Sequence, residues 1–250
     1  MRADSIWTAG LVGLAVWSAA PAARAQFQAP QNSREYEDTG TLEGVQGGFI
    51  KIRDSKNDSW VLETSEGTKI TVTGEADRDF LHSPALHVQF TGQIDKKGVL
   101  QKAIEAIEIF SAEGKSSLGL FVPAEGDAPP KPVRSAASGT FLIRGRLVSY
   151  KNGQVVVSAG SRKITGNVSD EAEVKLNVDD PGLGQAGDAV KVKAWYYDKS
   201  RPVAALNQPG SALAEEITIT LAKPLAYSGR KPRANDKASK PTAKSSHLSK

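Results

Sequence analysis

Residues 144–158 read RGRLVSYKNGQVVVS, and this stretch predicts the fold of the chain. Apolar and polar residues alternate on both sides of residues 151–153 (Lys-Asn-Gly), a tripeptide typical of a tight turn. Two strands joined by such a turn form a β-hairpin with one buried face and one wet face. An earlier stretch, residues 40–52, reads GTLEGVQGGFIKI and follows the same plan. The sequence therefore predicts the same hairpin twice.

A shift of 105 positions aligns the two hairpins. It places Leu147 on Leu42 and Gly153 on Gly48, and it matches the apolar residues of the second strands. Similar segments follow in both copies, with small changes of register; they are KIT at 69–71 and 163–165, and alternating stretches at 86–90, 190–194, 107–109 and 217–221. The candidates for helix, 75–81 and 100–107, are short. Each copy therefore predicts about five short strands.

About five short antiparallel strands that bury one face are typical of a small closed barrel, which leaves no free sheet edge. We therefore expect an all-β fold of two tandem antiparallel barrels, OB-like or SH3-like, at 39–110 and 139–224. One larger sandwich shared by both copies is the alternative. Residues 26–38 form an N-terminal extension, and the Pro-rich segment 111–138 is a linker. Its apolar residues 118–122 (LGLFV) are candidates for docking onto one barrel.

The pattern GxLxxxxxGxIxI at 40–52, followed by KITVT at 69–73, an alternating strand and IEI at 107–109, resembles bacterial secreted domains of unknown function with a small OB-like β-barrel. Both copies carry the resemblance, which covers about two-thirds of the chain after its N-terminal segment. It implies an exported bacterial protein and a barrel fold. It implies no activity and no catalytic residues.

The first 25 residues predict a secretory signal peptide. Arg2 precedes an apolar run at 6–20, and Ala23 and Ala25 form an A-x-A cleavage site, so cleavage is expected after Ala25. An uncleaved membrane anchor is the alternative, but the run is shorter than the roughly 20 residues that a membrane span needs. We therefore expect a secreted or periplasmic protein. The absence of cysteine excludes disulfides, thiolate metal sites and cysteine nucleophiles.

The net charge of +4 is unevenly distributed. Residues 228–250 hold seven cationic side chains and one aspartate, a net +6, whereas residues 26–227 have a net charge of −3. A basic segment rich in Ser, Pro and Ala predicts a disordered tail, here 225–250, that is attracted to an anionic cell-envelope polymer or a membrane surface. A solubilising end without a specific partner is the alternative.

The motifs that would indicate chemistry are absent or misplaced. Residues 182–187 (GLGQAG) match a dinucleotide fingerprint, but a turn precedes them and a predicted strand follows, where a bound pyrophosphate needs a helix. We expect a loop and no dinucleotide. His82 and His87 have no third metal ligand nearby, and no nucleophile motif occurs. The sequence therefore predicts that the protein is not an enzyme and that it binds no cofactor and no metal.

Residues 190–197 (VKVKAWYY) carry the candidate binding site. If the apolar residues face inward, one row points outward, and it comprises Lys191, Lys193, Trp195 and Tyr197. Further cations lie on other strands of the same copy, namely Arg144, Arg146, Arg162 and Lys163. The first copy's equivalent row, His87, Gln89, Thr91 and Gln93, lacks both cations and aromatics apart from the histidine. The alternative is that Trp195 and Tyr197 pack under the linker or against the first barrel.

These features predict an exported non-enzymatic binding or envelope-associated protein whose basic tail contacts a polyanion. The alternative is an OB-like module that binds an oligosaccharide or single-stranded nucleic acid on the aromatic and basic row of the second barrel. Of these two ligands, export favours the sugar. The sequence leaves the oligomeric state open.

Overall fold

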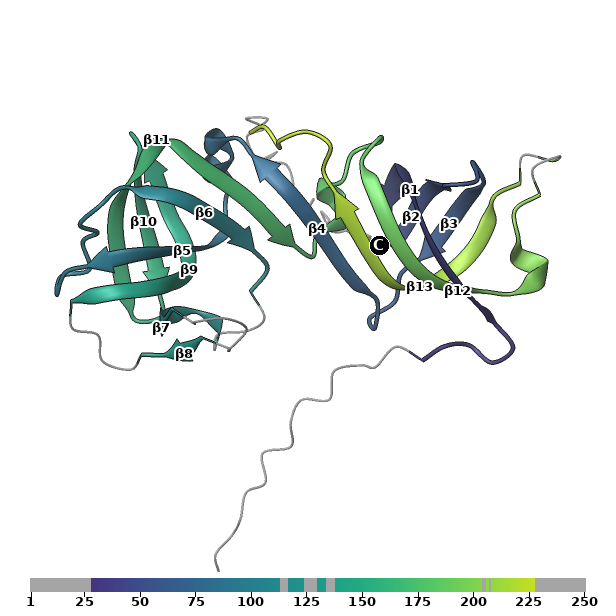
Figure 1. Ribbon diagram of the computed structural model, residues 1–250, viewed down its shortest axis with the longest axis horizontal. Helices are drawn as coiled ribbons and strands as arrows, with labels where there is room; N and C mark the ends of the chain where they lie inside the picture. Colours follow the sequence, from purple (N-terminus) through teal and green to yellow (C-terminus); the bar gives the residue numbers. More distant parts are fainter. Residues whose placement is uncertain are drawn as a thin grey trace, which may run out of the picture.

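The computed structural model describes residues 28–112, 117–123, 130–133, 138–203, 206 and 208–227. This part of the chain is β-sheet with short 3-10 segments (Figure 1). The strands before the linker are β1 (Arg34–Gln46), β2 (Phe49–Asp54), β3 (Ser59–Glu63), β4 (Lys69–Ala76), β5 (His87–Ile94) and β6 (Ile104–Phe110). The later strands are β7 (Gly119–Val122), β8 (Lys131–Pro132), β9 (Gly139–Lys151), β10 (Gln154–Ala159), β11 (Arg162–Val178), β12 (Ala189–Tyr196) and β13 (Gly210–Thr220).

Within the described residues, strands are connected by the 3-10 segments η1 (Arg78–His82), η3 (Pro181–Leu183) and η4 (Asp198–Ser200). The short helix predicted near 75–81 is therefore a single 3-10 turn, and the candidate at 100–107 becomes strand from Ile104 onward. Within the described residues, no helix is both long and apolar enough to cross a bilayer.

Five strands close into a barrel in the order β12-β1-β2-β3-β13, and β13 pairs back onto β12. Neighbouring strands are antiparallel except β3 and β13, which are parallel. The barrel interior holds alternate apolar residues such as Leu42, Ile52 and Ile217, all nearly inaccessible to solvent. The all-β class and a small closed barrel, both predicted from the alternation, are thereby confirmed.

The strand pairing crosses the predicted boundary between 39–110 and 139–224. The closed barrel takes β1, β2 and β3 from the first predicted unit and β12 and β13 from the second. Each predicted unit therefore shares its strands with the other, which corrects the expectation of one barrel per contiguous segment. The reason is that a strand at 189–196 pairs as readily with β1 as with its sequence neighbours, because alternation fixes a face and not a partner.

Five of the remaining strands form a second lobe, defined by β5, β6, β9, β10 and the first part of β11, up to Val168. Pairings join β9 to β10, β10 to β11, β11 to β6, β6 to β5, and β5 to β9. This lobe takes its meander from the second predicted unit and two strands from the first. Each lobe therefore combines three strands from one predicted unit with two strands from the other.

The two lobes are connected by β4 and the second part of β11, which run side by side between them (Figure 1). These strands pair antiparallel, with Thr73 opposite Asn177. On their outer sides, β4 pairs parallel with β13, and β11 pairs parallel with β6. A single continuous sheet path thus runs through the whole described chain.

The predicted linker and chain ends also enter the sheet. β7 pairs with β9, with Leu120 and Phe121 buried, so the apolar stretch 118–122 packs on the second lobe. Arg34 already begins β1, inside the predicted extension. Leu225 is buried and bridges Ala76, so the fold continues beyond the predicted start of the tail. The signal segment 1–25 and residues 228–250 lie outside the described residues.

Candidate functional site

The row predicted on β12 faces outward. Val190, Val192 and Ala194 are buried in the closed barrel, so the side chains between them project from its wall. This places on the outside the four residues predicted to bind a ligand, namely Lys191, Lys193, Trp195 and Tyr197.

Glutamates on the neighbouring strands neutralise the lysines of this row. Lys191 Nζ lies 3.4 Å from Glu37 Oε1 on β1. Lys193 Nζ lies 3.2 Å from Glu215 Oε1 on β13 and 3.4 Å from Glu35 Oε1 on β1. Three carboxylates thus surround two ammonium groups, and the row does not form the cationic surface that a polyanion requires.

The aromatic residues of the row have different environments. Trp195 is half-buried, and its Nε1 donates a 2.8 Å hydrogen bond to Glu215 Oε2, which fixes the indole ring. Trp195 lies opposite Glu35 of β1 and Leu213 of β13. Tyr197 is 42% exposed. The row therefore offers one fixed indole and one exposed phenol in an acidic surrounding.

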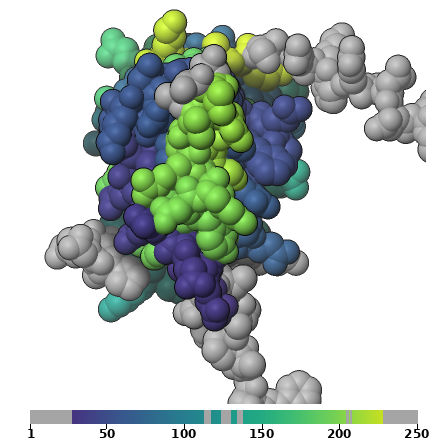
Figure 2. Space-filling model, turned by 90° about the vertical axis from the view of Figure 1, so that its right-hand side faces the viewer, coloured from purple at the N-terminus to yellow at the C-terminus, as the bar shows by residue number. Residues whose placement is uncertain are grey.

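A separate aromatic cluster closes one end of the closed barrel. The Trp60 ring centroid lies 4.5 Å from Tyr36 and 5.4 Å from Tyr196. The buried Asp54 carboxylate accepts hydrogen bonds from Tyr36 Oη and Trp60 Nε1, both at 3.1 Å. Arg201, which follows η4, lies over the Tyr196 ring at 5.4 Å from its centroid, and this part of the chain is green on the face shown in Figure 2. Because its polar atoms are paired, this cluster is structural.

The second lobe carries a cationic face, which we define as the outward residues of β9, β10 and the first part of β11. Its cations are Arg146, Lys151 and Lys163, all exposed. Ser158 lies directly opposite both Arg146 and Lys163, so one row crosses three strands. Arg144 also projects outward from β9 but is half-buried. The outward residues around the three exposed cations are neutral, namely Val148, Ser149, Gln154, Val156, Thr165 and Asn167. Among the described residues, none of the three cations forms an ion pair.

The matching face of the closed barrel has the opposite character. Residues 139–169 contain five cationic side chains and no acidic one, whereas residues 34–64, 105 positions earlier, contain four cations and seven acids. Lys51 Nζ lies 2.9 Å from Glu43 Oε2, and Arg53 pairs with the same carboxylate. These hydrogen bonds, from Lys51 first, hold the pKa of Glu43 below its ordinary value. Charge on this face is therefore compensated internally.

The sequence interpretation named Arg146 and Lys163 but placed the site on β12. The acid-free run 139–169 is the signal that identifies the cationic face, because it predicts cations without carboxylate partners whatever the strand order. Arg162, also named from the sequence, donates through Nη2 to the Lys96 carbonyl at 2.9 Å. Arg144 lies over the Phe110 ring and donates to Gln89, so it is less available.

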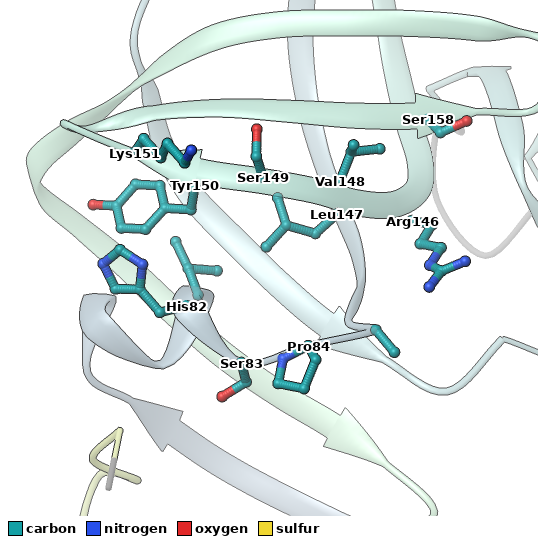
Figure 3. A pocket seen from close by; sticks show the side chains of 12 residues that line it. His82, Ser83, Pro84, Arg146, Leu147, Val148, Ser149, Tyr150, Lys151 and Ser158 are labelled. Atoms are coloured by element: carbon teal, nitrogen blue, oxygen red, sulfur yellow. The ribbon is translucent and has the colours of Figure 1, made fainter. Parts of the chain in front are cut away.

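A groove of about 760 Å³ borders the cationic face (Figure 3). One wall is the loop at 81–85, the other is β9 from Arg146 to Lys151, and Ser158 lies at its margin. The His82 ring faces the Tyr150 ring at a centroid distance of 4.9 Å. The groove thus has a cation at each end and a mixed apolar and hydroxyl middle.

The loop at 81–85, which forms one wall of the groove, lies next to β9, and a single backbone hydrogen bond joins Leu86, the residue after the loop, to β9 at Leu147. Leu147 N–H donates to the Leu86 carbonyl at 2.8 Å. No backbone hydrogen bond joins Ala85 N–H to the Leu147 carbonyl within the described chain. Ala85 has a φ of 61°, in the left-handed region that favours glycine.

The corresponding loop of the closed barrel is attached twice. Leu42 N–H donates to the Asp188 carbonyl at 2.8 Å, and Gly187 N–H donates to the Leu42 carbonyl at 2.9 Å. The buried Asp188 carboxylate also accepts from the N–H groups of Gln185 and Ala222, at 2.6 and 2.9 Å. Leu86 stands at the position of Asp188 and has no side-chain acceptor that could bind the loop in this way.

The GLGQAG stretch forms η3 and a loop that leads into β12, as the preceding turn and following strand predict. In the part of the chain that the structure describes, no three His, Asp or Glu side chains cluster in a way that could hold a metal ion. No protein-family model matches the chain, and no curated protein and no solved structure shows significant similarity to it.

Proposed function

We propose that this chain is an exported, non-enzymatic binding protein whose cationic face holds an extended anionic polymer. One observation carries the proposal: Arg146, Lys151 and Lys163 are exposed on a face without any carboxylate, whereas Lys51 and Arg53 on the corresponding face of the closed barrel are neutralised by Glu43. Uncompensated surface charge concentrates counter-ions of opposite sign and attracts polyanions.

The spacing of the cations suits a polymer better than a single small anion. Arg146 and Lys163 lie on strands that flank β10, so their backbones are about 10 Å apart, twice the strand spacing. Lys151 lies further along β9. An anion with a single charge can contact only part of this set, while a chain of regularly spaced charges can contact all three side chains.

The chain termini support the same function. The N-terminal segment has the features of a signal peptide cleaved after Ala25, which would place the protein in the periplasm or outside the cell. The tail, with a net charge of +6 over residues 228–250, would add salt-sensitive attraction to the same anionic cell-envelope polymer or to a membrane surface.

We also infer that both lobes are OB-like barrels. Each combines a three-stranded meander from one half of the chain with a two-stranded unit from the other half, and each contains a parallel pairing of the third and last strands. OB-like barrels bind oligosaccharides and oligonucleotides on the face of their second and third strands. In the second lobe these strands are β10 and β11, which form the cationic face together with β9; Lys163 lies on β11, and Arg146 and Lys151 lie on the adjacent β9.

Binding to an immobilised polyanion over a range of salt concentrations tests the proposed function. We expect retention that decreases as salt increases, and a much weaker retention for the double variant Arg146→Gln, Lys163→Gln. The matched control is Lys51→Gln, Arg53→Gln, which changes the net charge equally on the neutralised face. A third protein that lacks residues 228–250 separates the tail from the face.

The proposal requires that the Arg146, Lys163 variant loses more retention than the Lys51, Arg53 variant. Equal losses would show that only net charge matters and would overturn the role of the cationic face. Retention that depends on residues 228–250 alone would assign the function to the tail.

The row of Lys191, Lys193, Trp195 and Tyr197 is a second candidate, for a neutral oligosaccharide. The hydrogen bond to Glu215 fixes the Trp195 ring, and a fixed aromatic ring loses little entropy when a ligand stacks on it. Intrinsic fluorescence of the parent protein and of Trp195→Phe over a panel of glycans tests this role.

A further inference from the structure

We propose that the ligand of the cationic face is an acidic polysaccharide and that its chain lies in the groove beside β9. This inference rests on the proposed function and adds the class of polymer and its path. It depends on the shape of the groove, on the side chains that line it and on the absence of an exposed aromatic platform on the cationic face.

The groove has the size and lining that a sugar chain requires. Its volume of about 760 Å³ lies within the range of about 300–1,000 Å³ typical of ligand sites. Pro84 and Val148 supply apolar surface, and Val148 is 54% exposed at the position where the β9–β10 register shifts. Ser83, Ser149 and Ser158 supply hydroxyl groups. A pyranose ring offers both an apolar face and hydroxyl groups, so it matches this mixture.

The ends of the groove supply the charge. Arg146 lies at one end and Lys151 at the other, and both side chains are exposed (Figure 3). An arginine guanidinium can bind a carboxylate through two parallel hydrogen bonds, and a lysine ammonium acts as a point charge. Sugar units that carry carboxylates can therefore occupy both ends while the uncharged part of the chain fills the middle.

Single-stranded nucleic acid fits this face less well. Proteins that bind single strands stack the bases on aromatic side chains. The cationic face has no exposed Phe, Tyr or Trp among the described residues; Tyr150 is only 8% exposed, and the exposed His82 in the groove wall packs its ring against Tyr150. Tyr227 contacts His82 but does not line the groove. Charge and hydroxyl contacts remain, and these favour an acidic sugar chain over bases.

The closed barrel shows which substitution would block the groove. Glu43 occupies the position that Val148 occupies in the second lobe, 105 residues later. The substitution Val148→Glu would place a carboxylate inside the groove at an exposed position, where it would repel an anionic chain without disturbing the core. Val148→Gln is the matched control, because glutamine has the same shape and no charge.

The test measures binding of the full mature chain to three probes at one low salt concentration: polygalacturonate, oligo-deoxythymidylate and uncharged dextran. We expect binding to polygalacturonate, weaker binding to the oligonucleotide and none to dextran. Val148→Glu should weaken polygalacturonate binding by about tenfold or more, and Val148→Gln should leave it nearly unchanged. Circular dichroism of both variants checks that the fold is retained.

The possible failures separate the two proposals. If the oligonucleotide binds as tightly as polygalacturonate, the acidic polysaccharide is the wrong class while the proposed function stands. If Val148→Glu binds normally but Arg146→Gln with Lys163→Gln does not, the ligand lies on the cationic face outside the groove. If neither anionic probe binds, or if dextran binds equally, the proposed function itself fails.

Discussion

Leu42 and Leu147 occupy equivalent places in the two lobes, although 105 residues separate them. Each is buried, and each lies opposite an apolar residue of the following strand, Ile52 or Val157. Each also donates its N–H group to a carbonyl from the other half of the chain: Leu42 to Asp188, and Leu147 to Leu86. The register of both hairpins also shifts next to these leucines. The two lobes therefore follow the same local plan, and matched substitutions in them are comparable.

Gly40 and Gly145 are the first such pair. A Cβ at Gly40 would lie 2.1 Å from the Arg53 carbonyl oxygen, and one at Gly145 would lie 2.6 Å from that of Ser158. We expect either Gly→Ala substitution to lower the free energy of unfolding by about 1–3 kcal/mol, because the backbones must separate. Gly44→Ala, where nothing lies within 4 Å, is the control. Urea denaturation measures the stability of the three variants. If Gly40→Ala and Gly145→Ala were as stable as Gly44→Ala, the close approach of the backbones at Gly40 and Gly145 would be contradicted.

The strand exchange predicts that the chain stays together when it is cut. A protease site introduced within residues 124–129, followed by complete cleavage, should yield two fragments that elute as one folded particle. The reason is that β1 with β12, β5 with β9, and β4 with β11 all pair across the cut. Size-exclusion chromatography after cleavage measures the outcome. Fragments that separate and remain folded would show instead that each half is independent.

Asp54 is expected to be costly to remove. Its carboxylate is buried, accepts from Tyr36 and Trp60, and also accepts from the N–H groups of Lys56 and Asp58. Asp54→Ala should lower the free energy of unfolding by about 2–4 kcal/mol, since buried donors lose their acceptor.

Asp95 provides the control for the Asp54 substitution. It makes the same kind of turn, accepting from the N–H groups of Lys97 and Val99, both at 2.8 Å, but it binds no aromatic side chain. Asp95→Ala should therefore cost less than Asp54→Ala in urea denaturation. Similar costs would show that the bonds to the aromatic cluster contribute little.

The stability of the closed barrel should decrease at alkaline pH because of Tyr36. Burial first, and then the Asp54 carboxylate, raise the pKa of Tyr36 well above its ordinary value. The stabilisation is therefore present below about pH 10, the pKa of an unfolded tyrosine, and is lost as the pH rises from there towards the folded value. Urea midpoints at about pH 9 and about pH 11 measure the loss. Tyr36→Phe should show a smaller loss, and an equal loss would assign the effect to other groups.

The ion-paired row on β12 should contribute little to polyanion binding. Lys191→Gln with Lys193→Gln removes two cations that Glu35, Glu37 and Glu215 already neutralise. We expect retention on a polyanion to fall far less than for Arg146→Gln with Lys163→Gln. A larger fall for the β12 variant would restore that row as the binding site.

Local sequence pattern predicts much of this fold. The alternation at 40–52 and 144–158 gives the inward residues Leu42 and Leu147, and the glycine turns give the hairpins. The outward orientation of Lys191 and Lys193 follows from the same period of two. These features depend on residues that are near one another in the chain, so a single sequence is enough to predict them.

The partners of each strand were decided only by the tertiary structure. An alternating strand such as β12 specifies its buried face but carries no local signal for β1 rather than β9 as its neighbour. For the same reason, the neutralisation of Lys193 by Glu35 and Glu215 became visible only when three strands from distant parts of the chain were aligned.

The sequence by itself thus determined the elements, their faces and the acid-free run 139–169. The tertiary structure determined which charges meet, which loop is held by Asp188, and where the groove beside β9 opens. The physical reason is range: side-chain alternation and turn conformation act over a few residues. Strand pairing and charge compensation instead depend on contacts between residues more than 100 positions apart, such as Leu42 with Asp188.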